Sequence, residues 1–183
     1  WADGMELVIF EEFAAGGEAI HLAQLSERAE LLLNPSYRKR FQKEWGKLFS
    51  PRVFHRDLQK TKIISCPETH WNGKSFHEVA TEMGKQATEV FLDLCAKYGE
   101  KLRWYSVIGN DRTKQVEYIS NHPDILIGFS DAGAHLRNMA FYNYPLRLLK
   151  LVRDAQLRGE AFMTIERAVQ RLTGEVASWF RID

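Results

Sequence analysis

The residues best placed to do chemistry lie at positions 130–135, with the sequence SDAGAH. They follow an apolar run, and residues 125–130 together predict a short buried strand that ends at Ser130. A carboxylate just beyond the carboxyl end of such a strand occupies the place where α/β folds keep their catalytic groups. The small neighbours of Asp131, with glycines at 128 and 133, would let a substrate or a metal approach closely. Asp131 is therefore the first candidate for catalysis.

Three further side chains near Asp131 are candidates for binding. His135 lies four residues further on, so in a helix the two would share a face as a metal or proton-transfer pair. Arg137 has the guanidinium needed to clamp a substrate carboxylate, and Ser130 directly precedes the aspartate. Each has an ordinary alternative: Asp131 as a turn residue or helix N-cap, His135 as a surface histidine and Arg137 as a solvated arginine.

The cysteines and histidines elsewhere predict no metal centre of their own. Cys66 and His70 have the spacing of half a zinc site, but the chain contains no second half with matching spacing. Two cysteines, Cys66 and Cys95, do not make a disulfide framework and favour a reducing, cytoplasmic location, although a single bridge between them is an alternative. The chain also has no glycine-rich phosphate loop and no Gly-x-Ser-x-Gly nucleophile motif.

Composition excludes several classes of partner. The 183 residues carry 25 basic and 24 acidic side chains, for a net charge of +1, without charged blocks. We therefore expect neither a nucleic acid nor a membrane surface as partner, because both require a concentrated basic patch. At 45% hydrophobic residues the chain is long enough for one sizeable domain, and it contains no apolar run that would span a bilayer. It opens on Trp1 without a signal peptide, which predicts a processed or excised chain.

The hydrophobic periodicity of the sequence predicts the strands and helices around the candidate residues. Strands are expected at 62–66, 104–108 and 125–130, and a short helix at 112–121 with Val116 and Ile119 facing inward. Strand, helix and strand from 104 to 130 predict a βαβ unit, which requires two parallel strands and a right-handed crossover.

Helix boundaries are marked by capping residues. Asn34 followed by proline predicts a helix start, and Ser75 with Glu78 predicts a capping box at the start of a helix over 76–98, interrupted near Gly84. Thr164 is expected to cap a later helix. The aromatic residues that follow Asn34 recur at helical spacing and predict a core face, and the helix from 145 to 158 is expected to turn three apolar residues inward, Leu146, Leu149 and Val152.

Two motifs together carry a resemblance to a known family. The segment SDAGAH at 130–135 is followed by Tyr144-Pro145 and then by ERAVQRLTGEVA at 166–177. This pairing resembles the end of the catalytic barrel in the amidohydrolase superfamily, and most closely the branch of the N-acyl-D-amino-acid deacylases. The resemblance covers residues 100 to 183, and the regions around Asn34 and Ser75 fit the family more loosely.

The resemblance implies an α/β fold, a distorted TIM-type (β/α)8 barrel with one or two divalent ions, usually zinc, at the carboxyl ends of its strands. It implies hydrolysis of amide C–N bonds in small N-acyl amino acids or related linear or cyclic compounds. By position Asp131 would take the proton of the attacking water and pass it to the leaving nitrogen, and would be a possible metal ligand. Ser130, His135 and Arg137 would contact the substrate.

The chain also departs from this family. It has no His-x-His pair, which relatives carry on their first strand, and a (β/α)8 barrel needs about 250 residues. We therefore interpret residues 1–100 as a helical insert and connecting region, and residues 101–183 as the last two β/α units with terminal helices. Such a fragment is expected to be inactive alone and to bind no zinc. Because Cys66 falls in the insert, we do not assign it as the family's metal-bridging cysteine.

The alternative belongs to another class: a non-catalytic helical domain used for binding or assembly, with Asp131 as a structural cap. A partial barrel would expose its interior, so a homo-oligomer is expected in either case.

Overall fold

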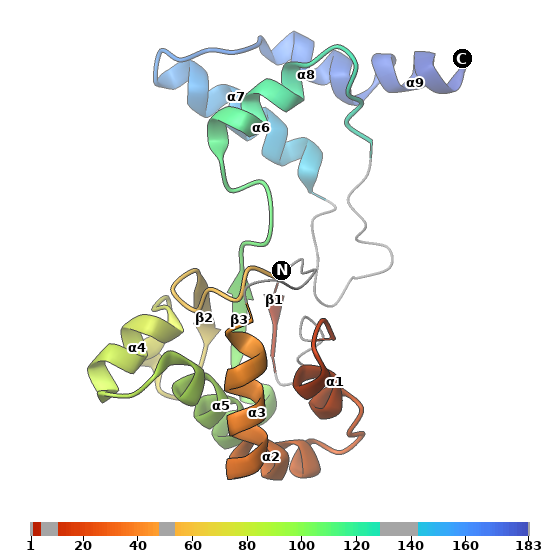
Figure 1. The fold of residues 1–183 in the computed structure, drawn as a ribbon. Helices are drawn as coiled ribbons and strands as arrows, with labels where there is room; N and C mark the ends of the chain where they lie inside the picture. Colours follow the sequence, from red (N-terminus) through yellow and green to blue (C-terminus); the bar gives the residue numbers. More distant parts are fainter. Residues whose placement is uncertain (1, 5–10, 48–53, 129–142, 183) are drawn as a thin grey trace. The chain divides into compact units, whose positions relative to one another are not determined.

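The computed structural model describes residues 2–4, 11–47, 54–128 and 143–182. Its contacts divide the chain into two compact units, Trp1–Ile108 and Gly109–Asp183 (Figure 1). The described residues form a helix-rich α/β structure, in agreement with the broad fold class expected from the sequence. The boundary predicted between residues 100 and 101, which separates a helical insert from the last two β/α units, stays a prediction.

Unit 1 contains a small antiparallel sheet. Its strands are β1 (Ala2–Asp3), β2 (Thr61–Ser65) and β3 (Arg103–Ser106), in the order β1-β3-β2. Ile63 lies opposite Trp104 in the pairing of β2 with β3. The strands predicted near 62–66 and 104–108 are thus confirmed.

The predicted parallel βαβ pair is wrong. Strand β3 already has a neighbour on each side, β1 and β2, and both pairings are antiparallel. No edge of β3 is left for a parallel partner. Residues 125–128, the described part of the strand expected at 125–130, are not in a strand.

Five α-helices of unit 1 are described, and two of them, α3 and α4, start at the predicted caps. They are α1 (Ala14–Ile20), α2 (Leu25–Leu33), α3 (Pro35–Trp45), α4 (Phe76–Met83) and α5 (Ala87–Tyr98), with 3₁₀ turns at Thr69–Trp71 and Gly99–Lys101. The Asn34 side chain accepts hydrogen bonds from the backbone N–H groups of Ser36 (2.9 Å) and Tyr37 (3.1 Å). The Ser75–Glu78 capping box is present, and Gly84 separates α4 from α5 with a φ of 64°.

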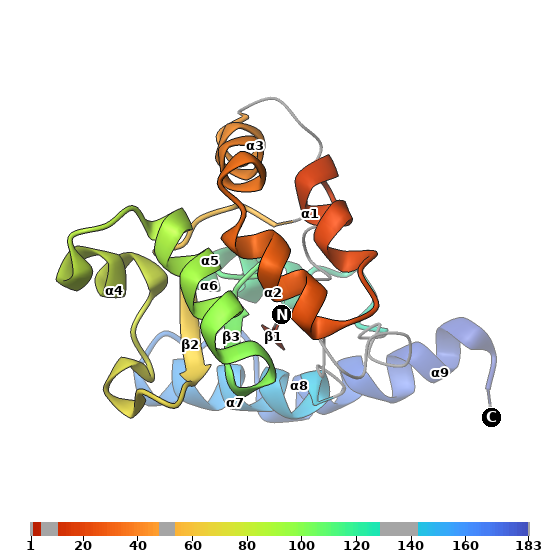
Figure 2. The same ribbon diagram turned by 90° about the horizontal axis from the view of Figure 1, so that it is seen from below.

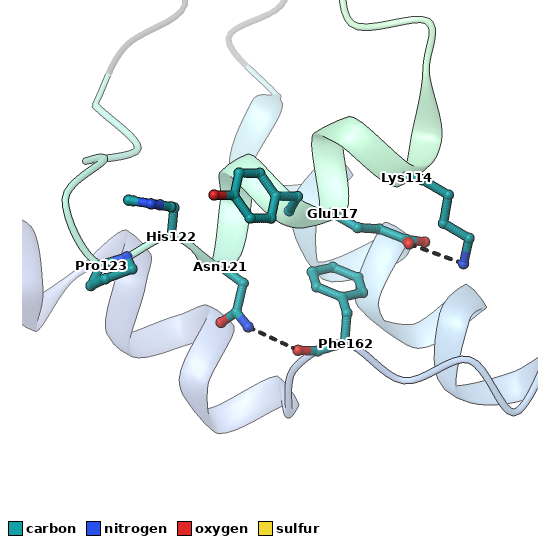
Figure 3. A pocket seen from close by; sticks show the side chains of 7 residues that line it. Lys114, Glu117, Asn121, His122, Pro123 and Phe162 are labelled. Atoms are coloured by element: carbon teal, nitrogen blue, oxygen red, sulfur yellow. Dashed lines mark hydrogen bonds and ion pairs between the residues drawn. The ribbon is translucent and has the colours of Figure 1, made fainter.

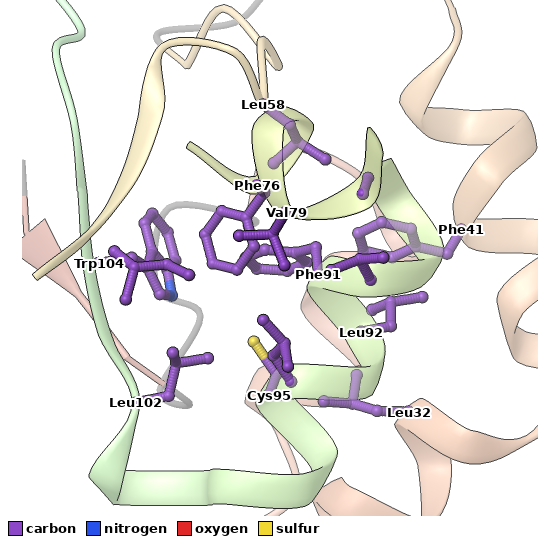
Figure 4. Packing of buried hydrophobic residues seen from close by; sticks show 14 of the residues in the cluster. Leu32, Phe41, Leu58, Phe76, Val79, Phe91, Leu92, Cys95, Leu102 and Trp104 are labelled. Atoms are coloured by element: carbon purple, nitrogen blue, oxygen red, sulfur yellow. The ribbon is translucent and has the colours of Figure 1, made fainter. Parts of the chain in front are cut away.

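The core of unit 1 is aromatic. The ring of Phe91 packs edge-on against Trp104 of β3 and Phe76 of α4, with centroids 5.6 and 4.9 Å apart (Figure 4). Helices α2 and α4 both pack against α5 (Figure 2). The predicted core face of α3 is confirmed, because Tyr37 and Phe41 are buried. Cys66 and Cys95 are buried free thiols, so the alternative of a bridge between them is wrong.

Unit 2 is helical in its described part. Its helices are α6 (Thr113–Asn121), α7 (Tyr144–Leu157), α8 (Ile165–Leu172) and α9 (Gly174–Phe180). Thr164 caps α8 as predicted, accepting a hydrogen bond from the backbone N–H of Arg167. A small cluster forms the core, made of the buried residues Leu148, Val152, Met163 and Ala168.

Two predicted inward faces in unit 2 need correction. Ile119 is 43% exposed and Leu146 is 68% exposed, whereas Glu117 and Ser120 are buried on α6. On α7 the prediction is confirmed for Val152, which is buried, and for Leu149, which packs against the core of unit 2, whereas Leu148 and Ala155 are buried in place of Leu146.

Among the described residues, no helix has the length and apolar character needed to cross a membrane.

Candidate functional site

The four residues predicted to form the site, Ser130, Asp131, His135 and Arg137, lie within 129–142, outside the described residues. Their roles therefore stay predictions. The chain on either side of this stretch is described, and its contacts show how unit 2 holds the backbone that leads to Asp131. We call residues 120–128 the approach segment.

The approach segment begins with a tight turn at the end of α6. The backbone N–H of His122 donates to the carbonyl of Ile119, and that of Ile125 donates to the carbonyl of His122. The Asp124 N–H donates to Nδ1 of His122 at 3.2 Å. Proline at 123 has no N–H to offer and fixes its own φ, so it suits this turn.

Arg171 of α8 holds both ends of that turn. Its Nε donates to the carbonyl of Ser120 at 2.9 Å, and one terminal nitrogen donates to the carbonyl of Ile125. The other terminal nitrogen donates to the Glu175 carboxylate at 2.7 Å. The Arg171 side chain is only 1% exposed. We call this arrangement the Arg171 clamp.

The clamp depends on the order of residues in α8 and α9. Arg171 lies in the last turn of α8 and Glu175 in the first turn of α9, so the two side chains meet across the break at Thr173. Arg167, one turn earlier, reaches the other oxygen of Glu175 at 3.1 Å but is 34% exposed. Glu175 therefore balances the charge of the buried guanidinium.

Two more contacts fix the approach segment near its carboxyl end. The Ile127 side chain packs against the core of unit 2. The Tyr144 hydroxyl, at the start of α7, donates to the carbonyl of Gly128 at 3.0 Å. Three of the last four residues of the approach segment are thus tied to α7, α8 or the core between them.

Arg171 was not among the functional residues predicted from the sequence. Its partners on the approach segment lie 46 and 51 residues away, so no local pattern reveals them. A weak signal exists, because Arg171 comes three residues after the small residue Ala168 and shares its inward face.

A shallow hollow of about 390 Å³ lies beside α6 (Figure 3). Its lining consists of Lys114, Glu117, Tyr118, Asn121, His122, Pro123 and Phe162. Lys114 is paired with Glu117 at 3.2 Å and with Glu160 at 2.9 Å, and its hydrogen bond to Glu160 raises its pKa. Asn121 donates to the carbonyl of Phe162. Because Lys114, Glu117 and Asn121 already form ion pairs or hydrogen bonds within the protein, we assign no substrate to the hollow.

In unit 1, a histidine and a serine lie close together but do not form a catalytic pair. Nδ1 of His55 accepts the backbone N–H of Asp57 at 2.9 Å, so the ring proton is on Nε2. Nε2 lies 2.7 Å from the carbonyl of Val107, to which it donates, and 3.2 Å from Oγ of Ser106. A protonated Nε2 cannot take the serine's proton, and Ser106 is fully buried.

The described residues do not fit a metal centre. Nowhere in the described ranges do three or more histidine, cysteine, aspartate or glutamate side chains gather where they could hold an ion. Burial also raises the pKa of the Cys66 thiol, which keeps it in the protonated form that binds metals poorly.

Comparison with known proteins gives relatives without a stated activity. The whole chain is 47% identical over 184 aligned residues to uncharacterized proteins of Mycobacterium tuberculosis and Mycobacterium bovis. It spans 30% of the length of these curated relatives. No family model matches the chain, and no solved structure matches it.

Proposed function

We propose that this chain is the late part of a larger metal-dependent amidohydrolase that acts on non-peptide amide bonds, in the manner of an N-acyl-D-amino-acid deacylase. The observation that carries the proposal is the pairing of the motif at 130–135 with the motif at 166–177. Arg171 of the second motif also binds the carbonyls of Ser120 and Ile125, which precede the first motif in the sequence. The greater length of the relatives leaves room for the remaining strands of a (β/α)8 barrel.

In this proposal Asp131 moves the proton. Water adds to the amide carbonyl carbon, Asp131 accepts the proton that the water loses, and it returns that proton to the nitrogen as the C–N bond breaks. Arg137 binds the carboxylate of the N-acyl amino acid, and Ser130 and His135 contact its polar groups.

The resemblance also calls for one or two divalent ions, which lower the pKa of a bound water when present. Asp131 is the only ligand that we propose from this chain. Because the described residues offer no ligand set, the remaining ligands are assigned to the rest of the full-length protein.

Asp131→Asn in the full-length protein tests the proposal. We expect kcat to fall by about 10²- to 10⁴-fold, because the amide of asparagine cannot accept the proton. Release of free amino acid from a panel of N-acetyl-D-amino acids measures turnover, and circular dichroism checks the fold. Asp124→Asn is the matched control, since that side chain is 88% exposed and seven residues earlier. Full turnover by the Asp131→Asn protein would remove the central claim.

One observation favours the alternative of a binding or assembly domain. Trp179 and Phe180 of α9 are adjacent in the sequence and 69% and 64% exposed, and exposed apolar side chains that lie together mark contact surfaces. The coding sequence upstream of Trp1 discriminates between the two functions, because the amidohydrolase requires a strand there that ends in His-x-His.

A further inference from the structure

We propose that His55 is an acid-sensitive latch: its neutral ring holds the segment 54–60 against the end of β3, and protonation of the ring opens this contact. All residues of the latch lie in unit 1 and in the described part of the chain. The latch works in the same way whether or not the full-length protein is an amidohydrolase.

A closed ring of hydrogen bonds surrounds the histidine. The backbone N–H of Asp57 donates to Nδ1 of His55 at 2.9 Å. On the other side, Nε2 lies 2.7 Å from the carbonyl of Val107 and 3.2 Å from Oγ of Ser106. Oγ of Ser106 lies 3.1 Å from Oγ1 of Thr61, which donates to the carbonyl of Asp57 at 2.9 Å. The series of bonds therefore begins and ends at Asp57.

The chemistry of the groups fixes the direction of every bond in this ring. The N–H of Asp57 can only donate and its carbonyl can only accept. Thr61 gives its hydroxyl proton to that carbonyl, so it accepts from Ser106, which in turn accepts from Nε2. Only a neutral imidazole with its proton on Nε2 completes the network. Because Thr61 and Ser106 are fully buried, a hydroxyl that lost its partner here would be costly.

A second proton on the imidazole breaks the network at Nδ1. That nitrogen changes from an acceptor to a donor, and it then faces the N–H of Asp57, which is also a donor. Histidine is the side chain that ordinarily changes its charge between about pH 5 and 8. His55 is partly exposed, so solvent can supply the proton. The bond to Nδ1 is therefore present at neutral pH and is lost as the pH falls.

The charged residues next to His55 are Arg56 and Asp57, and both are bonded elsewhere. The Arg56 guanidinium donates to the carbonyl of Glu44 at 2.9 Å and lies over the ring of Phe13. The Asp57 carboxylate accepts the backbone N–H of Gln59 at 2.9 Å. The groups that β2 and β3 contribute to the network are uncharged, two hydroxyls and a carbonyl. We therefore assign the response to acid to His55 itself.

Backbone strain favours opening once the bond to Nδ1 is lost. Arg56, between the two bonded residues, has a φ of 57°, which a residue with a side chain keeps only where its surroundings hold it. At its other end the latch holds the carbonyl of Val107, one residue before the end of unit 1. Acid should thus loosen the segment 54–60 from the last residues of this unit.

Hydrogen–deuterium exchange of the full-length protein at pH 7.5 and pH 5, corrected for the intrinsic effect of pH, tests the latch. A peptide covering residues 55–61 contains the amide of Asp57. In His55→Asn, the side-chain oxygen can accept that amide two residues on, as in an Asx turn, but the side chain does not titrate. His21→Asn is the matched control, because it makes the same change at an exposed histidine at the end of α1.

In the wild-type protein we expect the peptide 55–61 to lose about tenfold of its protection between pH 7.5 and pH 5, the factor that one hydrogen bond contributes. His55→Asn should have equal protection at both pH values. His21→Asn should lose as much as the wild type. The peptide 87–98, which covers most of the buried helix α5, should keep its protection in all three proteins.

Three results would overturn the latch. The first is wild-type protection of the peptide 55–61 that does not change with pH. The second is an acid response in His55→Asn as large as that of the wild type, because another group would then carry it. The third is an equal loss in the peptide 87–98, which would mean that acid loosens the whole unit. If His55→Asn does not fold, His55→Gln takes its place, since its amide also does not titrate.

Discussion

Asp93 joins three parts of unit 1 through one carboxylate. One oxygen accepts from Arg38 of α3 at 2.6 Å and the other from Lys85, which follows α4, at 2.9 Å. Arg38 also donates to the carbonyl of Leu32 at the end of α2. Partial burial opposes the charge, but the bonds from Lys85 and Arg38 outweigh it and hold the pKa of Asp93 below its usual value.

This lowered pKa makes a pH-dependent contribution to stability. At neutral pH, Asp93→Asn should lower the free energy of unfolding by about 1 kcal/mol, because a partly buried ion pair is lost. Since the folded state has the lower pKa, the wild-type advantage is present above about pH 4 and is lost as the pH falls through the folded value. Urea unfolding of the 183-residue chain at pH 7 and pH 2.5 measures both differences.

Asp124→Asn is the control for this measurement, because its side chain is 88% exposed. It should change the free energy of unfolding by less than about 0.5 kcal/mol. A deficit of the Asp93→Asn chain that is equally large at both pH values would contradict the assignment.

Single residues were predictable where their partners are close in sequence. Asn34, Ser75 and Thr164 bond to backbone groups two or three residues away, so their types and spacing were enough. Arg171 and Glu117 were not recognised, because burial of a charged residue depends on partners that only the folded chain brings near. The catalytic role of Asp131 is predicted from the sequence alone, because this residue lies outside the described residues.

At the scale of elements, the break between α4 and α5 depends on one backbone conformation. Gly84 has a φ of 64°, and the next residue, Lys85, donates its N–H back to the carbonyl of Ala80 at 3.0 Å. A Cβ at Gly84 would have no atom within 4 Å. Any cost of adding a side chain there therefore comes from the left-handed backbone and from no steric clash.

Gly84→Ala should accordingly lower the free energy of unfolding by about 1 to 2 kcal/mol. Gly17→Ala is the matched comparison, because Gly17 lies inside α1 and a Cβ there also has no atom within 4 Å. It should raise the free energy of unfolding by about 0.5 to 1 kcal/mol, since alanine is the better helix former. Urea unfolding of the chain compares the two variants, and effects of the same sign would refute the explanation.

The absence of the predicted strand from residues 125–128 has a reason at this same scale. The run of β-branched and apolar residues is typical of a buried strand, and sequence alone offered nothing against it. In the structure the carbonyls of Ile125 and Gly128 accept hydrogen bonds from the side chains of Arg171 and Tyr144. In a strand these two carbonyl groups would be available to bond a neighbouring strand, whereas here they are bonded to side chains of α8 and α7.

At the scale of the whole molecule, the two units differ in how much core they have. The cluster of unit 1 includes large aromatic residues such as Phe91 and Trp104, whereas that of unit 2 has four buried members. The helix-rich α/β class was predictable from periodicity. The division at residues 108 and 109 was not, because it depends on which contacts form in space.

The metal content of the short and the full-length chain should differ. The 183-residue chain, dialysed after purification, should contain no stoichiometric zinc, because the family's first-strand histidines are absent from it. The full-length protein should contain one or two ions per chain and should lose activity with a chelator and regain it with zinc. Elemental analysis by mass spectrometry makes the measurement, with full-length Cys66→Ser as a control of unchanged content. One tightly bound zinc in the short chain would reverse this view.

The sequence separation between Arg171 and Ile125 also affects the order in which unit 2 can fold during synthesis. Arg171 is synthesised 46 residues after Ile125. At about 5 to 20 residues per second, the approach segment leaves the ribosome on the order of 2 to 10 seconds before its clamp exists. During synthesis, the turn at residues 120–125 is therefore among the last described features of unit 2 to be fixed, after α6 and α7 have already been made.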